Sequence, residues 1–417
     1  MAVPSVIQLQ CGCNSYPWGK QGSKSLAATL CAKTPGWTGK GPSEKFSIDE
    51  SQPYAEMWMG TYPELPSYVL STGQDLQELI DKNKDTLVGD GVLQKFGHSK
   101  IPFLPKILSI AKALPLQLHP NKELAAKLHK EDPSNFTDPN HKPEIALALS
   151  DFEAFCGFKP LEDIHALLQL EPLKQYLPNS SDKFNNNDLK EVVRAMLKAD
   201  ESSVKKTVEA LQKLPDSSFG SDTHIKPLIP RLVEQYEETD NGILVALITM
   251  NFLKLKPGEV ISIPADGIHA YLYGDIVECM ARSNNVLNTG FCPRAERNSV
   301  DLFCSCLTFA PHSIAECRLP PKPYHGGKNG KTEIFTPPMN EFNILSTKIK
   351  AGEKEIINPI DGPSIAIATS GNGTLSSNGE EFAVKEGSIW FIGKGTEVKL
   401  DAKENLVWYT AFADPST

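Results

Sequence analysis

The hydrophobic and polar positions follow one period in the outer parts of the chain and another in its middle. Before about residue 155, and again over 253–310, short apolar runs end at Gly or Pro, which is typical of strands. Helices are expected within the first stretch at 74–81 and 122–129. From residue 335 onwards the pattern again indicates strands, and Asn378-Gly379 predicts a tight hairpin.

In the middle of the chain, apolar residues recur every three or four positions, which predicts amphipathic helices. Asp188 precedes Glu191 by three positions, so we expect a capping box to begin the first of these helices. Pro215 is expected to end the next helix, and further helices are expected over 230–238 and 243–252. Helices between two strand-rich stretches predict an inserted helical domain.

Composition and charge narrow the class of protein. A chain of 417 residues is long enough for two or three domains, and its net charge of -9 argues against nucleic acid as a partner. Its nine cysteines include no C-x-x-C pair, which argues against a cysteine zinc knuckle and favours reduced thiols. The sequence shows neither a signal peptide nor an apolar run of about 18 residues, so we expect a cytoplasmic protein with no membrane partner.

Two short stretches carry candidate metal ligands. Gln117 and His119 are two positions apart in a predicted strand, so both side chains face the same side. Gly258, Pro264 and His269 keep the spacing of the second cupin motif, and Glu144 follows His119 by 25 positions. An amide oxygen, two imidazoles and a carboxylate are ligands that zinc accepts.

Each of these residues also has a plainer interpretation. A single His in the position of His269 is more often structural, and a Gln-x-His pair is more often incidental. A single Glu such as Glu144 is most often solvated. The prediction of a metal site therefore depends on their combination.

Five segments together resemble the type I mannose-6-phosphate isomerases, and the resemblance spans nearly the whole chain: residues 14–19 (NSYPWG), 54–60 (YAEMWMG), 116–120 (LQLHP), 140–144 (NHKPE) and 269–281 (HAYLYGDIVECMA). The resemblance implies one zinc ion per chain, held by Gln117, His119, Glu144 and His269. It also implies interconversion of mannose 6-phosphate and fructose 6-phosphate, which supplies mannose for GDP-mannose and glycan synthesis.

The fold class that follows is mainly β, with a cupin (jelly-roll) barrel core, an inserted α-helical domain and a C-terminal cupin-like β domain. We expect the zinc cupin domain to comprise residues 1–155 and 253–320. The helical insertion is expected over 156–252 and the C-terminal β domain over 332–417.

The isomerase chemistry needs a base, a proton relay and a group that stabilises an oxyanion. The resemblance makes Lys142 the candidate base and His141 the candidate for ring opening. Glu278, on the strand after His269, is a further candidate acid or base. The plainer interpretations are a solvated loop charge for Lys142 and an ion pair with a buried Arg or Lys for Glu278.

A phosphate group needs cations, because its charge must be balanced. Arg294 and Arg297 are candidates, and so is Lys106, whose charge lies inside an apolar run. The plainer interpretation of Lys106 is an edge-strand lysine that reaches solvent with its ammonium.

The sequence departs from the family pattern at three positions. Asn288 stands where an active-site Arg is usual, Asn284 where an Asp is usual, and Pro115 where a Ser is usual. Asn288 keeps a predicted role in substrate binding, but an amide cannot supply the charge of the Arg. Our hypothesis is that Arg294 compensates.

Three other functions remain open from the sequence. The chain could be a sugar-phosphate-binding cupin without turnover, an isomerase of another sugar phosphate, or an iron-dependent redox cupin. Binding without turnover is favoured by Asn284 and Asn288, whereas the amide ligand Gln117 argues against iron chemistry. In each case we expect a small-molecule partner and a monomer.

Overall fold

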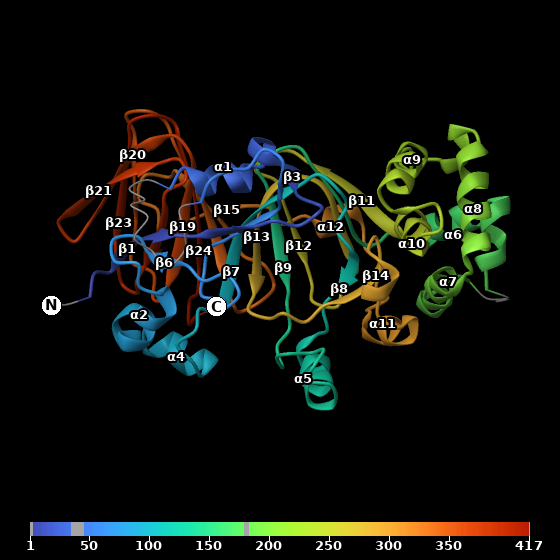
Figure 1. The fold of residues 1–417 in the computed structure, drawn as a ribbon, viewed down its shortest axis with the longest axis horizontal. Coiled ribbons are helices and arrows are strands. Elements are labelled where there is room, and N and C mark those ends of the chain that lie inside the picture. Colours follow the sequence, from blue (N-terminus) through green and yellow to red (C-terminus); the bar gives the residue numbers. More distant parts are fainter. Residues whose placement is uncertain (1–2, 35–45, 179–182, 417) are drawn as a thin grey trace.

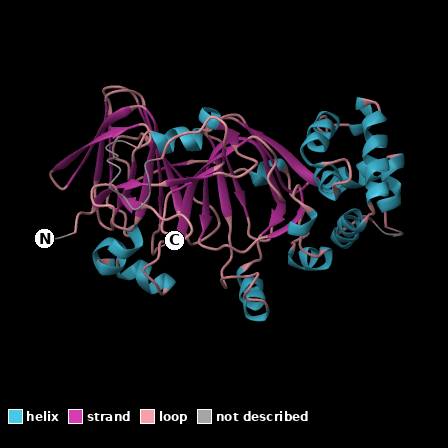
Figure 2. Cartoon of the chain, viewed as in Figure 1, coloured by secondary structure: helices cyan, strands magenta, loops and turns pink. Residues whose placement is uncertain are grey.

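The computed structural model describes residues 3–34, 46–178 and 183–416. Figure 1 shows three parts along the long axis of the molecule: C-terminal sheets at one end, a central β barrel, and a group of helices at the other end. Figure 2 shows how strands fill the first two parts and helices the third. The predicted fold class is therefore confirmed.

The central barrel is a ten-stranded antiparallel sheet. Its strands are β2 (Gly12–Asn14), β5 (Glu56–Trp58), β7 (Phe103–Ile110), β8 (Leu116–Leu118), β9 (Glu144–Ala148), β10 (Phe152–Phe158), β11 (Met250–Leu255), β12 (Val260–Ile263), β13 (His269–Ala281) and β14 (Leu287–Gly290).

Strand β13 organises this barrel because it pairs with β7, β8, β9 and β10. Twelve of its thirteen residues are buried, as expected for a strand covered on both faces. Gly274 lies within it at φ +121°, where a Cβ would come within 2.5 Å of the carbonyl oxygen of Asp151. A residue without a side chain is therefore needed for β10 and β13 to approach each other at this point.

The C-terminal part is built from two antiparallel sheets. The eight-stranded sheet holds β15 (Lys322–Pro323), β16 (Thr332–Phe335), β17 (Asn343–Ile349), β19 (Ser364–Ser370), β22 (Ile389–Ile392) and β24 (Leu406–Phe412), together with β1 (Val6–Gln10) and β6 (Tyr68–Val69). The four-stranded sheet holds β18 (Lys354–Ile357), β20 (Asn372–Ser377), β21 (Glu380–Lys385) and β23 (Val398–Ala402).

The predicted hairpin forms between β20 and β21. Asn378 and Gly379 both have positive φ, at 51° and 80°, as a type I′ turn requires.

Strand β1 does not pair with the barrel that follows it in sequence. It lies between β22 and β6, with Leu9 opposite Ile389 and Val69. The predicted division assigned residues 1–155 to the first domain as a whole, and the hydrogen bonding of β1 and β6 departs from it. The other domain boundaries stay predictions.

Two apolar cores join the β parts. One packs the eight-stranded sheet against the barrel, with Ile7, Phe391 and Tyr409 on one side and Ile107 and Val277 on the other. The other lies between the two C-terminal sheets and includes Trp390, Trp408 and Leu400.

The helical part comprises α6 (Leu161–Leu168), α7 (Asn186–Lys198), α8 (Glu201–Lys213), α9 (Ile225–Tyr236) and α10 (Asn241–Thr249). The apolar residues that predicted these helices face one core. The α-helices outside this part are α1 (Leu26–Ala32), α2 (Leu76–Lys82), α3 (Lys84–Leu87), α4 (Asp90–Phe96), α5 (Lys122–Glu131), α11 (Val300–Cys306) and α12 (Ile314–Cys317). Strands β3 (Lys20–Gln21) and β4 (Pro53–Tyr54) form a separate two-stranded sheet.

Several predicted helix bounds were wrong. The helix expected over 243–252 is α10, which ends at Thr249, because residues 250–252 belong to β11. Helix α7 does begin with a capping box, but Asn185 is its N-cap and Asp188 is the third helical residue, because the Asn185 side chain reaches the backbone N–H groups first. Helix α9 begins five residues before Pro230, because Ile225 and Leu228 extend its buried face. In the described ranges, no helix has the length and apolar character to cross a membrane.

Candidate metal centre and active site

Three predicted metal ligands meet inside the barrel. His119 follows β8, Glu144 begins β9 and His269 begins β13, so each stands at a strand end. The possible ligand atoms of the three lie within 4.8 Å of one another, and all three residues are buried. The Glu144 carboxylate is 3.3 Å from Nε2 of His119 and 3.6 Å from Nε2 of His269.

The hydrogen bonds of the two imidazoles fix which nitrogen carries the proton. His119 Nδ1 lies 2.7 Å from the carbonyl oxygen of Asn285, and His269 Nδ1 lies 2.9 Å from that of Gly267. A carbonyl can only accept, so Nδ1 donates and Nε2 keeps a lone pair in both rings. Burial lowers the pKa of His119 to about 4 and also lowers that of His269, so both rings are neutral near pH 7.

This arrangement fits a zinc ion. Within the described residues, both Nε2 atoms are buried without a hydrogen-bond partner. Two lone pairs that face a buried carboxylate repel it unless a cation lies among them. Backbone carbonyls that orient the other ring nitrogens are the usual outer support of zinc-binding histidines.

Gln117 lies in the same row of the barrel. On β8 it stands directly opposite His269 of β13 and Asn288 of β14. Opposed residues of antiparallel strands point to the same face, so these side chains share one side of the sheet. The fourth ligand role of Gln117 stays a prediction, which this position supports.

Sequence reasoning missed Tyr271, whose hydroxyl donates to Glu144 at 3.3 Å. Tyr271 is two residues after His269 on β13, so the alternation of the strand already places both on one side. The phenol orients the carboxylate in the way that outer groups orient metal ligands.

Lys142 and His141 lie in the loop that leads into Glu144. Lys142 Nζ is 3.6 Å from the Glu144 carboxylate. His141 Nε2 lies 2.7 Å from the buried carboxylate of Glu341, which precedes β17. The C-terminal part of the chain thus holds the orientation of His141, and the sequence pattern gave no sign of this because 200 residues separate the pair.

The structure joins two predicted site residues that had been given separate roles. Lys106 of β7 stands opposite Glu278 of β13, and its ammonium lies 2.9 Å from that carboxylate and 3.6 Å from Glu56. The charge of Lys106 is therefore already balanced. Glu278 forms the ion pair with a buried lysine that its plainer interpretation describes. Burial raises the pKa of Glu278 to about 7 although Lys106 lowers it, and the nearby carboxylates of Glu144 and Glu56 add to the rise.

The remaining predicted residues lie around β14. Asn288 has a buried side-chain oxygen that finds no hydrogen-bond partner among the described residues. Arg297 forms an ion pair of 2.7 Å with buried Asp240, whereas half-exposed Arg294 pairs with Glu201 at 3.0 Å. Both arginines line a cavity of about 350 Å³ together with Lys112. They do not contact the three buried ligands.

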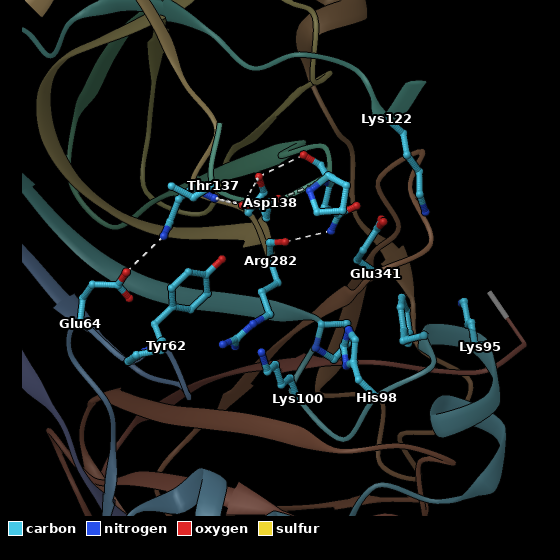
Figure 3. Close-up of a pocket in the computed structure, with 17 residues that line it drawn as sticks. Tyr62, Glu64, Lys95, His98, Lys100, Lys122, Thr137, Asp138, Arg282 and Glu341 are labelled. Atoms are coloured by element: carbon cyan, nitrogen blue, oxygen red, sulfur yellow. Dashed lines mark hydrogen bonds between the residues drawn. The ribbon is translucent and has the colours of Figure 1, made fainter. Parts of the chain in front are cut away.

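A larger cavity of about 590 Å³ lies beside the His141 loop. Its wall includes Asn140, Asn284 and Glu341, the last of which binds His141. Figure 3 shows Tyr62, Arg282 and Lys100 on one part of this wall and Glu341 and Lys122 on another. Within the described ranges, Lys100 and Lys122 form no ion pair.

Comparison with known proteins agrees with this geometry. The model described as "Phosphomannose isomerase type I, catalytic domain" matches residues 6–161, and the one described as "Phosphomannose isomerase type I C-terminal" matches 332–379. The mannose-6-phosphate isomerase of Aspergillus fumigatus is 36% identical and covers 98% of this chain and 96% of its own. The Saccharomyces cerevisiae enzyme is 34% identical over 99% of both chains.

This chain belongs to the type I phosphomannose isomerase family. The predicted family is thereby confirmed. The solved Salmonella typhimurium mannose 6-phosphate isomerase is 25% identical, with a TM-score of 0.81 over 99% of this chain and 100% of the other. A second structure of that enzyme, with the same TM-score, is bound to fructose 6-phosphate and zinc. A cupin core with a helical insertion is thus the fold of a phosphomannose isomerase.

Replacing a ligand tests the metal centre of this phosphomannose isomerase. We expect His269→Gln to bind zinc at least about 10- to 100-fold more weakly, since even outer-shell changes have effects of that size. Zinc content per chain after dialysis measures the effect. His129→Gln is the matched control, because His129 is a half-buried histidine of α5 that contacts the Phe136 carbonyl. Equal zinc content in all three proteins would contradict the assignment.

The raised pKa of Glu278 predicts a pH-dependent difference in the zinc-free protein. A carboxyl group whose pKa is higher in the folded chain makes the folded state less stable as pH rises from 4.5, its ordinary pKa, to about 7. Above about pH 7 this contribution to the free energy of unfolding no longer changes. Glu278→Gln should therefore gain stability over the wild type across that interval, on the order of 3 kcal/mol. Denaturant unfolding at a series of pH values measures it, with exposed Glu123→Gln as control. A pH-independent difference would contradict the prediction.

Proposed function

We propose that this chain interconverts mannose 6-phosphate and fructose 6-phosphate, with one zinc ion held by Gln117, His119, Glu144 and His269. The observation that carries the proposal is the buried cluster of His119, Glu144 and His269, in which both free imidazole nitrogens face one carboxylate. The chain matches curated mannose-6-phosphate isomerases over nearly their whole length, and this match supports the proposed substrate and reaction.

An aldose–ketose isomerisation moves a proton between C1 and C2 of the opened sugar. It needs a base at carbon, groups that exchange protons with the oxygens, and stabilisation of the developing oxyanion. Zinc bound at this site would supply a Lewis acid for that oxyanion.

We assign the base to Lys142, whose amine lies beside the metal centre at 3.6 Å from Glu144. His141 is assigned to ring opening, which requires a proton to be exchanged with the ring oxygen. Its contact with Glu341 at 2.7 Å holds the imidazole in one orientation. Burial raises the pKa of Glu278 to about 7. Near neutral pH this carboxyl is therefore partly protonated, as a group that both donates and accepts protons needs to be.

The substrate contacts that we propose lie on β14 and in the loop after it. The unpartnered oxygen of Asn288, in the row of Gln117, suits a sugar hydroxyl that donates to it. Arg294 is our candidate for the phosphate because its guanidinium is half exposed and lines a cavity with Lys112 and Arg297. Arg297, held by Asp240, would contribute its charge from a fixed position.

The cellular setting belongs to the same proposal. The reaction would supply mannose for GDP-mannose and glycan synthesis in the cytoplasm. Its partner is a small sugar phosphate, with no nucleic acid or membrane, and the enzyme acts as a monomer.

A coupled assay with mannose 6-phosphate tests the function directly. We expect turnover that is lost after chelation and restored by added zinc, because the zinc would supply the Lewis acid that stabilises the developing oxyanion. Metal content is measured in the same samples. Protein that retains zinc and gains thermal stability from the sugar phosphate, yet shows no turnover, would contradict the isomerase assignment. That result would favour the sugar-phosphate-binding alternative, to which Asn284 and Asn288 point.

Two variants locate the phosphate. Arg294→Ala should lower kcat/KM about 10- to 100-fold, the range expected for losing a charged hydrogen bond. Lys122→Ala, which removes a cation from the cavity of Figure 3, is the matched comparison and should leave kcat/KM near the wild-type value. The opposite pattern would place the phosphate in the larger cavity and remove Arg294 from the site.

A further inference from the structure

Two cysteines that the isomerase chemistry does not use lie together beside the barrel. Cys156 is on β10 and Cys317 is the last residue of α12, and both are buried. The Cys317 thiol lies 3.5 Å from the carbonyl oxygen of Cys156 and 3.6 Å from that of Ser313, and either carbonyl can accept its proton. All nine cysteines lie in the described ranges and are free thiols.

A histidine completes this cluster. Interaction with Cys317 raises the pKa of the His312 imidazole, and His312 in turn lowers the pKa of Cys317. Its ring lies against Gly157, where a Cβ would come within 2.4 Å of the ring nitrogen, so the residue after Cys156 makes room for it. The amide of Asn251 lies 3.9 Å from the Cys317 sulfur.

The side chains of Cys156 and His312 favour the thiolate of Cys317. The hydrogen bond from Cys156, together with that from His312, lowers the pKa of Cys317 to about 6, although burial and Glu316 act in the opposite direction. Burial instead raises the pKa of Cys304 and of Cys306, on α11. A thiolate is the form that attacks an oxidant, so Cys317 differs in reactivity from those buried cysteines.

The neighbours of Cys317 line a cavity of about 540 Å³: Ile314, the exposed first residue of α12, and Arg318, which follows the helix. Cys317 itself is buried, so the proposed reaction needs this four-residue helix to open locally and admit a small oxidant.

We propose that Cys156 and Cys317 form an oxidation site, which hydrogen peroxide converts into a reversible disulfide. The Cys317 thiolate attacks one peroxide oxygen, the O–O bond breaks, and a sulfenic acid forms as hydroxide leaves with a proton to give water. The Cys156 sulfur then displaces the sulfenic oxygen as a second water while the S–S bond forms. Two thiols are oxidised and one peroxide is reduced to two waters.

The proposed disulfide would lie next to the metal centre. Cys156 stands opposite His269 in the pairing of β10 with β13. The crosslink would therefore tie the strand beside a zinc ligand to α12, across 161 positions of the chain.

Peptide mapping tests the proposal on the intact zinc-loaded protein. After exposure to peroxide and blocking of remaining thiols, we expect a Cys156–Cys317 crosslinked peptide that dithiothreitol removes. Cys317→Ser should abolish the crosslink, whereas Cys306→Ser, which changes another buried cysteine, should retain it. His312→Gln should slow its formation several-fold.

A second measurement needs no variant. In the wild type, the rate of crosslink formation should stay nearly level down to pH about 6, the pKa of Cys317. An ordinary thiol would lose about tenfold in rate for each pH unit below about 8.5. Absence of the crosslink, or that steep pH dependence, would overturn the proposal.

Discussion

The arrangement of the barrel interior depends on burying charge together with its compensation. Glu144 is buried with two neutral imidazoles, and a carboxylate in that position is unfavourable unless a cation balances it. The same constraint applies on the neighbouring strands, where Lys106 faces Glu278 and Glu56. Strand β13 supplies His269, Tyr271 and Glu278, so it links the metal centre to this second charged group.

The site residues that are related by short sequence spacings could be predicted from the sequence. The two-residue spacing of Gln117 and His119, and the Gly-Pro-His spacing that ends at His269, depend only on strand alternation and turn chemistry. Contacts between residues far apart in the sequence could not be predicted in this way. Lys106 with Glu278, and His141 with Glu341, are brought together by sheet register and by the packing of separate domains, which leave no trace in a local pattern.

The fold shows the same division. Amphipathic spacing predicted the helices of the insertion, but Asn185 rather than Asp188 is the cap of α7, because competing polar residues near a helix start resemble one another in sequence. Strand patterning likewise indicated strands before residue 155 without indicating that the first of them, β1, pairs with β22. The departures at Asn284 and Asn288 were visible in the sequence, and the unpartnered oxygen of Asn288 is what the structure adds to them.

The placement of β1 has a consequence for how the protein is made. Residues 6–9 pair with residues 389–392, so about 380 residues must be synthesised before the first strand meets this partner. At the usual rate of translation, this takes roughly 20 to 75 seconds. During that time an apolar strand, which contributes Ile7 and Leu9 to the core between the β parts, has an open edge. Until β22 emerges and pairs with β1, this edge of the nascent chain therefore remains open to pairing with other chains.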